Sequence, residues 1–199
     1  AVPRTVVSVL QNEYVTWLKH DQHAQAWNIL TDSDAKRIAY HLGIAAPEKD
    51  PTCTACHVSQ DARTLTKTDA LLPTDGVTCE SCHGPAERYL KSHSARGATH
   101  ADNLKAGLYD LANLSSRAAR CASCHFGSAS APLIHRIYGA GHPRLSFELD
   151  TFNAIMPAHW KLDDDYVQRK QTSYDGGVAW LQGQIALARG TLQALRDPK

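Results

Sequence analysis

Apolar residues near the start of the chain recur at the spacing of a helix. Between residues 5 and 30, Leu10 and Trp17 belong to such an apolar face, and the pattern predicts one helix over that range. The polar cluster Thr31 to Asp34 is typical of a helix N-terminus, so we expect a second, shorter helix that ends at Gly43.

The C-terminal part carries a more regular pattern. Six apolar residues recur at intervals of 3, 4, 3, 4 and 3 residues: Val178, Leu181, Ile185, Ala188, Leu192 and Leu195. This spacing predicts an amphipathic helix with a seam like the a and d positions of a coiled coil. We expect residues 1–165 to form one domain and residues 166–199 to form this helix, which packs either on that domain or on a partner.

The remaining segments read mostly as loops. Polar residues or Gly, Pro, Ala and Ser dominate residues 45–52, 58–78, 94–106 and 126–144. Further helices are expected over residues 85–93 and 108–120. The predicted fold class is mainly α with long loops and little sheet.

Composition adds that large apolar side chains are scarce. Aromatic residues make up 7% of the 199 residues, and Phe occurs three times, so something other than side chains is expected to fill part of the interior. A net charge of +1 gives no basic patch for nucleic acid or a membrane surface, and no stretch is long and apolar enough for a transmembrane segment. Eleven histidines are a high count.

All six cysteines lie in three copies of the motif C-x-x-C-H. The copies are Cys53-Thr54-Ala55-Cys56-His57, Cys79-Glu80-Ser81-Cys82-His83 and Cys121-Ala122-Ser123-Cys124-His125. This motif is the attachment signature of a c-type haem, in which two thiols form thioethers with the haem and the adjacent histidine binds the iron as proximal ligand. The sequence therefore predicts three covalently bound haem c groups, around which the core is built.

Two other uses of such cysteines explain the pattern less well. A zinc site would pair C-x-x-C units into sets of four ligands, and three units do not pair. A redox dithiol or a disulfide framework gives no reason for a histidine after every second cysteine. The haem interpretation accounts for every cysteine.

The sixth ligand of each iron is expected to be histidine for at least two haems. Met156 is the single methionine, so His/Met ligation can occur once at most. Eight histidines remain after the three proximal ones: His20, His23, His41, His93, His100, His135, His142 and His159. Bis-histidine ligation lacks the thioether that raises the potential, so low-potential haems are expected.

The segment Gly76 to Pro85, GVTCESCHGP, resembles the hallmark haem-binding segment of the cytochrome c-554 family of tetrahaem electron carriers. Weaker similarities extend over roughly residues 14 to 160: they are Trp17 with His23 to Ala26, Cys53 to Val58, His93 ten residues after His83, and Ala140 to Leu149. One departure is clear, because the family has a further C-x-x-C-H ahead of the Trp17 region and this chain has none there.

The resemblance implies a set of distal ligands. It pairs His23 with the haem of His83, and it pairs His93 with the missing haem, so the role of His93 stays open. The candidates left for the haems of His57 and His125, in either order, are His135 and His142, with His159 as an outside candidate. We expect no ligand among His20, His41 and His100.

The function expected is electron transfer between redox partner proteins, by hopping from haem to haem, without enzymatic activity. Two alternatives stay open. In the family, the haem that corresponds to His57 can lack a distal ligand, and an open iron would allow a haem enzyme or small-ligand binder; Glu80, Glu87 and Arg88 lie nearby in sequence. The chain could also be a subunit of a larger cytochrome assembly or filament.

Haem attachment outside the cytoplasmic membrane predicts a periplasmic or extracellular protein whose signal peptide has been removed.

Overall fold

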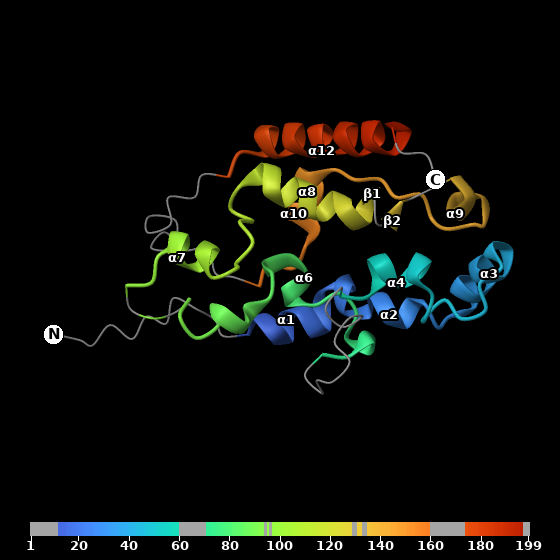
Figure 1. The fold of residues 1–199 in the computed structure, drawn as a ribbon, viewed down its shortest axis with the longest axis horizontal. Coiled ribbons are helices and arrows are strands. Elements are labelled where there is room, and N and C mark those ends of the chain that lie inside the picture. The colour runs from blue at the N-terminus through green and yellow to red at the C-terminus, as the bar shows by residue number, and fades with distance from the viewer. Residues whose placement is uncertain are drawn as a thin grey trace.

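The computed structural model describes residues 12–59, 71–93, 95, 97–128, 131–132, 135–159 and 174–196, and this part of the chain is mainly helical (Figure 1). The elements in chain order are α1 Glu13–His20, η1 Gln22–Gln25, α2 Ala26–Ile29, α3 Ser33–Leu42, α4 Pro51–His57, η2 Pro73–Asp75, α6 Cys79–His83, η3 Ala86–Arg88, α7 His100–Lys105, α8 Leu114–His125, β1 Gly127–Ser128, β2 Ala131–Pro132, α9 His135–Gly139, α10 Leu149–Ile155 and α12 Gly176–Arg196. The predicted mainly helical class is confirmed.

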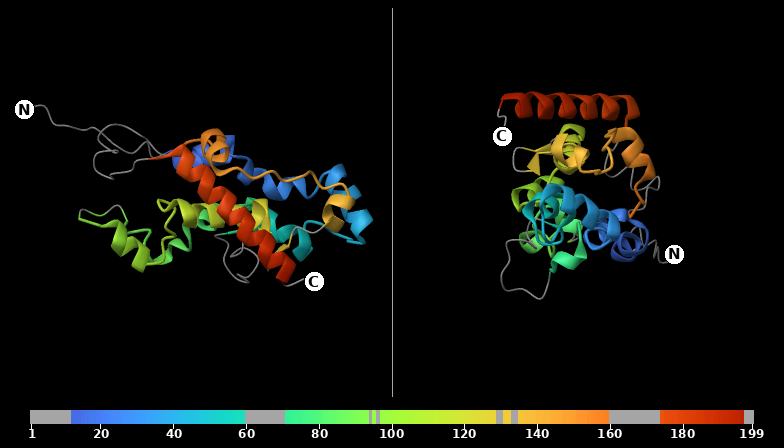
Figure 2. Two further views of the ribbon diagram at one scale, coloured as in Figure 1. Left: turned by 90° about the horizontal axis from the view of Figure 1, so that it is seen from above. Right: turned by 90° about the vertical axis from the view of Figure 1, so that its right-hand side faces the viewer.

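The elements lie in three tiers (Figures 1 and 2). The helices α1 to α4 form one tier, α8, α10 and the β1–β2 hairpin form the middle one, and α12 lies across the outer side of α8. The helix α12 contacts α8, α10 and β1, whereas α4 contacts α2 and α8. The third C-x-x-C-H motif, on α8, therefore lies between the other two tiers.

The predicted continuous helix over residues 5–30 is wrong within the part that the structure describes. The helix α1 ends at His20, and Asp21 takes an extended conformation with φ −91° and ψ 125°. The Asp21 carboxylate then accepts a hydrogen bond from the backbone N–H of His23 and so caps η1. An aspartate that bonds the backbone two residues on favours such a break over helix continuation. Residues 5–11 lie outside the described part.

The short helix before the first motif is confirmed. Asp32 caps α3 by accepting a hydrogen bond from the backbone N–H of Ala35 at 2.8 Å. At the other end, Gly43 has φ 73°, a left-handed conformation that glycine adopts at little cost.

Two predicted helices are shorter than expected. Over residues 85–93 the structure has only the 3₁₀ turn η3, because the buried Tyr89 donates its hydroxyl to the backbone carbonyls of His83 and Gly84 and folds the segment back. The helix that leads into the third motif, α8, begins at Leu114 rather than at residue 108. Its N-cap is Asn113.

The predicted loop over residues 126–144 is interrupted by α9 and by the antiparallel hairpin β1–β2, in which Gly127 pairs with Pro132.

The predicted C-terminal helix is confirmed as α12, and small residues form its inner face. Ala179 and Gly183 are buried against a cluster that contains Ala118 and Leu149. A Cβ atom at Gly183 would lie 3.1 Å from the Cβ of Leu149, so the helix approaches its neighbours closely.

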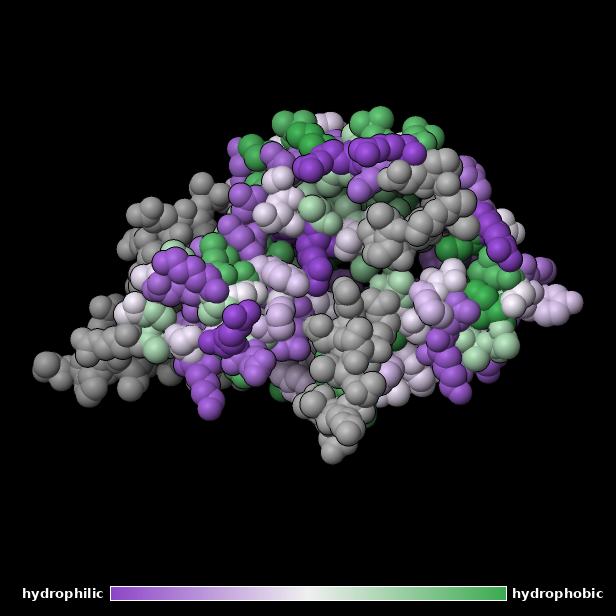
Figure 3. Space-filling model, in the orientation of Figure 1, coloured by the Kyte–Doolittle hydropathy of each residue, from purple (hydrophilic) through white to green (hydrophobic). Residues whose placement is uncertain are grey.

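The heptad seam of α12 points outward instead. Large apolar side chains line the outer surface of α12 in Figure 3. Those of the seam are 41% to 73% exposed: Val178, Leu181, Ile185, Leu192 and Leu195. The face that a coiled coil would bury is thus not the face that packs on α8.

Apolar packing is sparse elsewhere. A second small cluster contains Leu42, Ile137 and Ala140, and Leu149 and Ser59 are the largest fully buried side chains among the described residues. An interior with this little apolar side-chain volume fits a chain that is completed by bulky apolar cofactors. Within the described part, no helix has the length and apolarity needed to cross a membrane.

Candidate haem sites

Each C-x-x-C-H motif forms the end of a helix. The helices α4, α6 and α8 end at His57, His83 and His125, respectively. In a helix the two cysteines, three residues apart, lie on the same face, with the histidine next to the second cysteine. All six cysteines are described and none forms a disulfide. The local geometry thus presents two thiols and an imidazole together, three times.

Each motif histidine has a second histidine ring opposite it. The ring centroids are 6.4 Å apart for His57 and His142, at an interplanar angle of 78°. They are 6.1 Å apart for His83 and His159, at 84°. They are 6.0 Å apart for His125 and His23, at 88°. The structure therefore brings three separate pairs of histidines together, each with one member from a motif.

These distances match those of two imidazoles that share a metal ion. Two rings that bind one ion from opposite sides, through metal–nitrogen bonds of about 2 Å each, have centroids roughly 6 Å apart, because each ring adds about 1 Å between nitrogen and centroid. Imidazoles stacked in direct contact would lie closer. Six histidines thus form three donor sets that suit an iron between each pair.

Burial keeps the motif histidines in the form that binds metal. Desolvation lowers the pKa of His57 and of His83, and His142 and His159 respectively lower them further. Desolvation and the nearby His23 lower the pKa of His125 to about 4. An iron ligand must be a neutral imidazole, and a lowered pKa favours the neutral form of all three rings.

Backbone carbonyls orient several of these rings. The Nδ1 atom of His57 donates to the carbonyl of Ala26 at 2.8 Å, and that of His142 donates to the carbonyl of Pro143 at 2.8 Å. A proton fixed on Nδ1 leaves the lone pair on Nε2, the nitrogen that would face the iron.

His23 differs because its Nδ1 meets a carboxylate, Asp21 Oδ1, at 2.8 Å. The hydrogen bond to Asp21 raises the pKa of His23 against the opposing effect of burial. Burial acts to raise the pKa of Asp21, but hydrogen bonds from His23 and the nearby His23 and His159 rings outweigh it, so the net shift is downward.

Ser59 ties the first motif to the second. Its hydroxyl, two residues after His57, is fully buried and donates to the carbonyl of Gly76 at 3.1 Å. The same oxygen accepts the backbone N–H of Thr78 at 2.8 Å and lies 2.6 Å from the hydroxyl of Ser81 inside the second motif. One side chain thereby fixes where the two motifs lie relative to each other.

Gly76 ties the second motif to the segment that carries His23. It has φ 69°, and a Cβ there would lie 2.7 Å from the carbonyl oxygen of His23. The adjacent Val77 donates its N–H to that carbonyl at 3.0 Å, and its own carbonyl accepts from Trp17 Nε1 at 3.1 Å. Only glycine fits this close crossing of two backbones.

Arg120 ties the third motif to the second. It precedes Cys121, donates its Nε to the carbonyl of Ser81, and lies over the ring of Tyr109 with its guanidinium carbon 4.7 Å from the centroid. The third motif also lies next to the first, because α4 contacts α8 and Cys56 lowers the pKa of the Cys124 thiol. The three motifs therefore converge in one region.

The other histidines take different positions. His135 is exposed at the first residue of α9 and lines a cavity of about 550 Å³ together with His142 and Arg144. His93 is exposed, and its Nδ1 donates to the carbonyl of Leu90 at 2.7 Å. His20 and His41 are also exposed, at the ends of α1 and α3.

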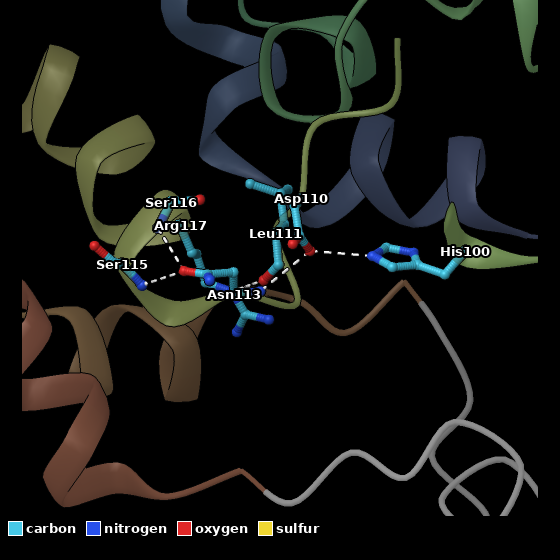
Figure 4. Close-up of polar contacts among 7 residues, drawn as sticks. All are labelled: His100, Asp110, Leu111, Asn113, Ser115, Ser116 and Arg117. Carbon is cyan, nitrogen blue, oxygen red and sulfur yellow. Dashed lines mark hydrogen bonds and ion pairs between the residues drawn. The ribbon is translucent and has the colours of Figure 1, made fainter. Parts of the chain in front are cut away.

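His100 belongs to a polar network at the start of α8 (Figure 4). Its Nε2 lies 3.1 Å from Asp110 Oδ1, which also accepts the backbone N–H of Asn113. Asn113 Oδ1 in turn accepts from the backbone of Ser115 and Ser116 and caps α8. The contacts of His100 therefore serve the helix that carries the third motif.

The histidine pairs differ in part from the arrangement that the family resemblance implies. That resemblance pairs His23 with the haem of His83, whereas the ring facing His83 is that of His159, and His23 faces His125. His142, a candidate for either remaining haem, faces His57. Sequence reasoning missed Asp21, although an aspartate two residues before a candidate ligand is a recognisable capping signal.

Comparison with known proteins gives one match. A family model described as cytochrome c554 and c-prime matches residues 11–84, which include the first two motifs, Ser59 and Gly76. No curated protein and no solved structure matches the chain. Over this part, and with haem-attachment motifs on three helices, the chain resembles the multihaem c-type cytochromes of the cytochrome c554 family.

Proposed function

We propose that the chain is an electron-transfer cytochrome with three haem c groups, each held between two histidines. The haems attach at Cys53 and Cys56, at Cys79 and Cys82, and at Cys121 and Cys124. The axial pairs are His57 with His142, His83 with His159, and His125 with His23. The observation that carries the proposal is the set of three ring pairs 6.0 to 6.4 Å apart, each opposite a motif histidine.

Closed irons favour electron transfer over catalysis. A haem enzyme needs one open coordination position at its iron. The haem of His57 is the candidate for such an open iron, but the ring of His142 lies opposite His57. Glu80, one of the polar residues considered for catalysis, accepts the backbone N–H of Ala86 and serves the local fold. Bis-histidine ligation favours low potentials, and the haem supplies the redox chemistry while the chain positions it.

Close motifs favour hopping between haems. The helix α4 of the first motif contacts α8 of the third, and Arg120 on α8 bonds the Ser81 carbonyl of the second, so the three haems would be attached close to one another. Electrons would enter from one redox protein and leave to another, and haem attachment places the protein in the periplasm or outside the cell.

Single histidine variants test the ligand assignment. We expect His142→Ala, His159→Ala and His23→Ala each to convert one haem of the oxidised protein from low-spin to high-spin, measured by electron paramagnetic resonance. His135→Ala and His93→Ala are the matched controls and should leave the spectrum unchanged. A high-spin haem in either control, with none in the three test variants, would overturn the assignment. Intact mass after denaturation counts the haems, and we expect three.

A second candidate role is that of a subunit that pairs through α12. The heptad seam is exposed over most of the helix, and a second copy supplies a matching seam. Native mass measured over a concentration series should show a dimer that Ile185→Glu dissociates and that the neighbouring Gln184→Glu preserves. A monomer at every concentration would rule this role out.

A further inference from the structure

Asp21 is a buried carboxylate next to a proposed iron ligand. It is 9% exposed, whereas aspartate is rarely buried without partners. Its Oδ1 accepts two hydrogen bonds from one residue, from the backbone N–H of His23 at 2.9 Å and from His23 Nδ1 at 2.8 Å. The carboxylate therefore fixes both the backbone and the ring of His23.

The position of the His23 backbone is fixed independently. Its carbonyl accepts the N–H of Val77 at 3.0 Å, beside the close crossing at Gly76. The backbone is thus held from one side and the ring from the other, and the ring centroid of His125 lies 6.0 Å from that of His23.

The partner of His23 is charged, unlike the partners of two other paired histidines. His57 and His142 donate their Nδ1 protons to the neutral backbone carbonyls of Ala26 and Pro143. A carboxylate that accepts the Nδ1 proton makes the imidazole a stronger electron donor to a bound metal. It also places a negative charge near the iron, which favours the oxidised, more positive state.

We propose that Asp21 is a positioning residue that lowers the midpoint potential of the haem held by His23 and His125. When bound, the haem would exchange one electron with a redox partner protein, while the proton stays between His23 Nδ1 and Asp21 Oδ1 and no bond breaks. The inference rests on the proposed function, because it requires that His23 binds iron.

The substitution Asp21→Asn isolates the charge. Asparagine is as good an N-cap as aspartate, so the hydrogen bond to the His23 backbone and the turn are kept. The matched control is Asp32→Asn. Asp32 is the N-cap of α3 and also accepts through one side-chain oxygen, from the backbone N–H of Ala35, but it is exposed. Both variants are made in the holoprotein.

A spectroelectrochemical redox titration of the three haems measures the effect. We expect Asp21→Asn to move one midpoint potential upward and to leave the other two less affected, while Asp32→Asn moves none. In His23→Ala the haem that becomes high-spin should be the one whose midpoint responds to Asp21→Asn.

The outcomes distinguish a failure of the ligand assignment from a failure of the role proposed for Asp21. If His23→Ala leaves every haem low-spin, the ligand assignment fails. If His23→Ala produces a high-spin haem but Asp21→Asn shifts no midpoint, or shifts it no more than Asp32→Asn, the role of Asp21 is wrong while the ligand assignment stands.

Discussion

The first two motifs and the α8–α12 layer are held together by different means. The segments around α4 and α6 are held to each other by hydrogen bonds of Ser59 and by the close backbone crossing at Gly76. Between α8 and α12, buried Ala118, Ala179 and Leu149 form an ordinary apolar cluster. The contrast suggests that the first region depends on its cofactors for apolar contact, whereas the second has a small core of its own.

Removal of the haems should have the largest effect, and this effect should differ between the two regions. In a variant with all six cysteines replaced by alanine, we expect α4 and α6 to lose almost all protection from hydrogen exchange, because little apolar side chain replaces the cofactor. The segments of α8 and α12 should keep more of theirs. Equal protection of α4 in the haem-free and haem-loaded proteins, measured by mass spectrometry, would contradict this contrast.

The backbone crossing at Gly76 provides the next largest effect. In Gly76→Ala the new side chain meets a positive φ of 69° and its Cβ overlaps the carbonyl of His23, so the variant should lower the free energy of unfolding by roughly 2–4 kcal/mol. Gly43→Ala is the control, because Gly43 has φ 73° but nothing within 4 Å of an added Cβ; it should cost about 1–2 kcal/mol. Equal losses in denaturant titrations would show that the crossing is not tight.

The next prediction concerns the contact between α8 and α12, where small residues form the buried face of α12. Ala179 is completely buried, so Ala179→Leu should overfill the α8–α12 contact and lower the free energy of unfolding by about 1–3 kcal/mol. Leu181→Gln, on the seam where Leu181 is 49% exposed, should change the monomer's stability by less than about 0.5 kcal/mol. If Leu181→Gln proves the more damaging in thermal unfolding of the monomer, the two faces of α12 have been assigned the wrong way round.

The hydroxyl of Ser59 gives the smallest effect. Ser59→Ala leaves the half-buried Thr78 N–H and the buried Gly76 carbonyl without this partner and should lower the free energy of unfolding by about 1–2 kcal/mol. Ser92→Ala is a matched control, since Ser92 is exposed and bonds only locally to the carbonyl of Tyr89, and its loss should be barely measurable. Chemical denaturation measures both variants. If both unfold at the same denaturant midpoint as the wild type, Ser59 does not hold the two motifs together.

Local sequence patterns predict the parts of the fold that depend on local physics. Capping residues predict α3, apolar spacing predicts α12, and the C-x-x-C-H motif identifies the six cysteines with their adjacent histidines. Apolar periodicity does not predict the break at Asp21, because an aspartate cap competes with it. Which face of α12 packs inward was also not predicted, because close packing against Leu149 selects Ala179 and Gly183 over larger residues.

The histidine pairs depend on contacts between distant segments. His159 follows α10 and faces His83 of α6, and His142 follows α9 and faces His57 of α4. Spacing along the chain carries no information on how the loops between them fold, so the residues alone indicate a set of candidate histidines, and the partner of His83 implied by the family resemblance differs from the one in the structure. The three-dimensional arrangement narrows that set to one opposing ring for each motif.

In the proposed structure, histidine closes all three irons. Electron paramagnetic resonance of the fully oxidised holoprotein, integrated against its haem content, tests this closure. We expect the low-spin signals to integrate to three haems per chain. A high-spin signal that integrates to one haem per chain would contradict it and would make that iron an open site.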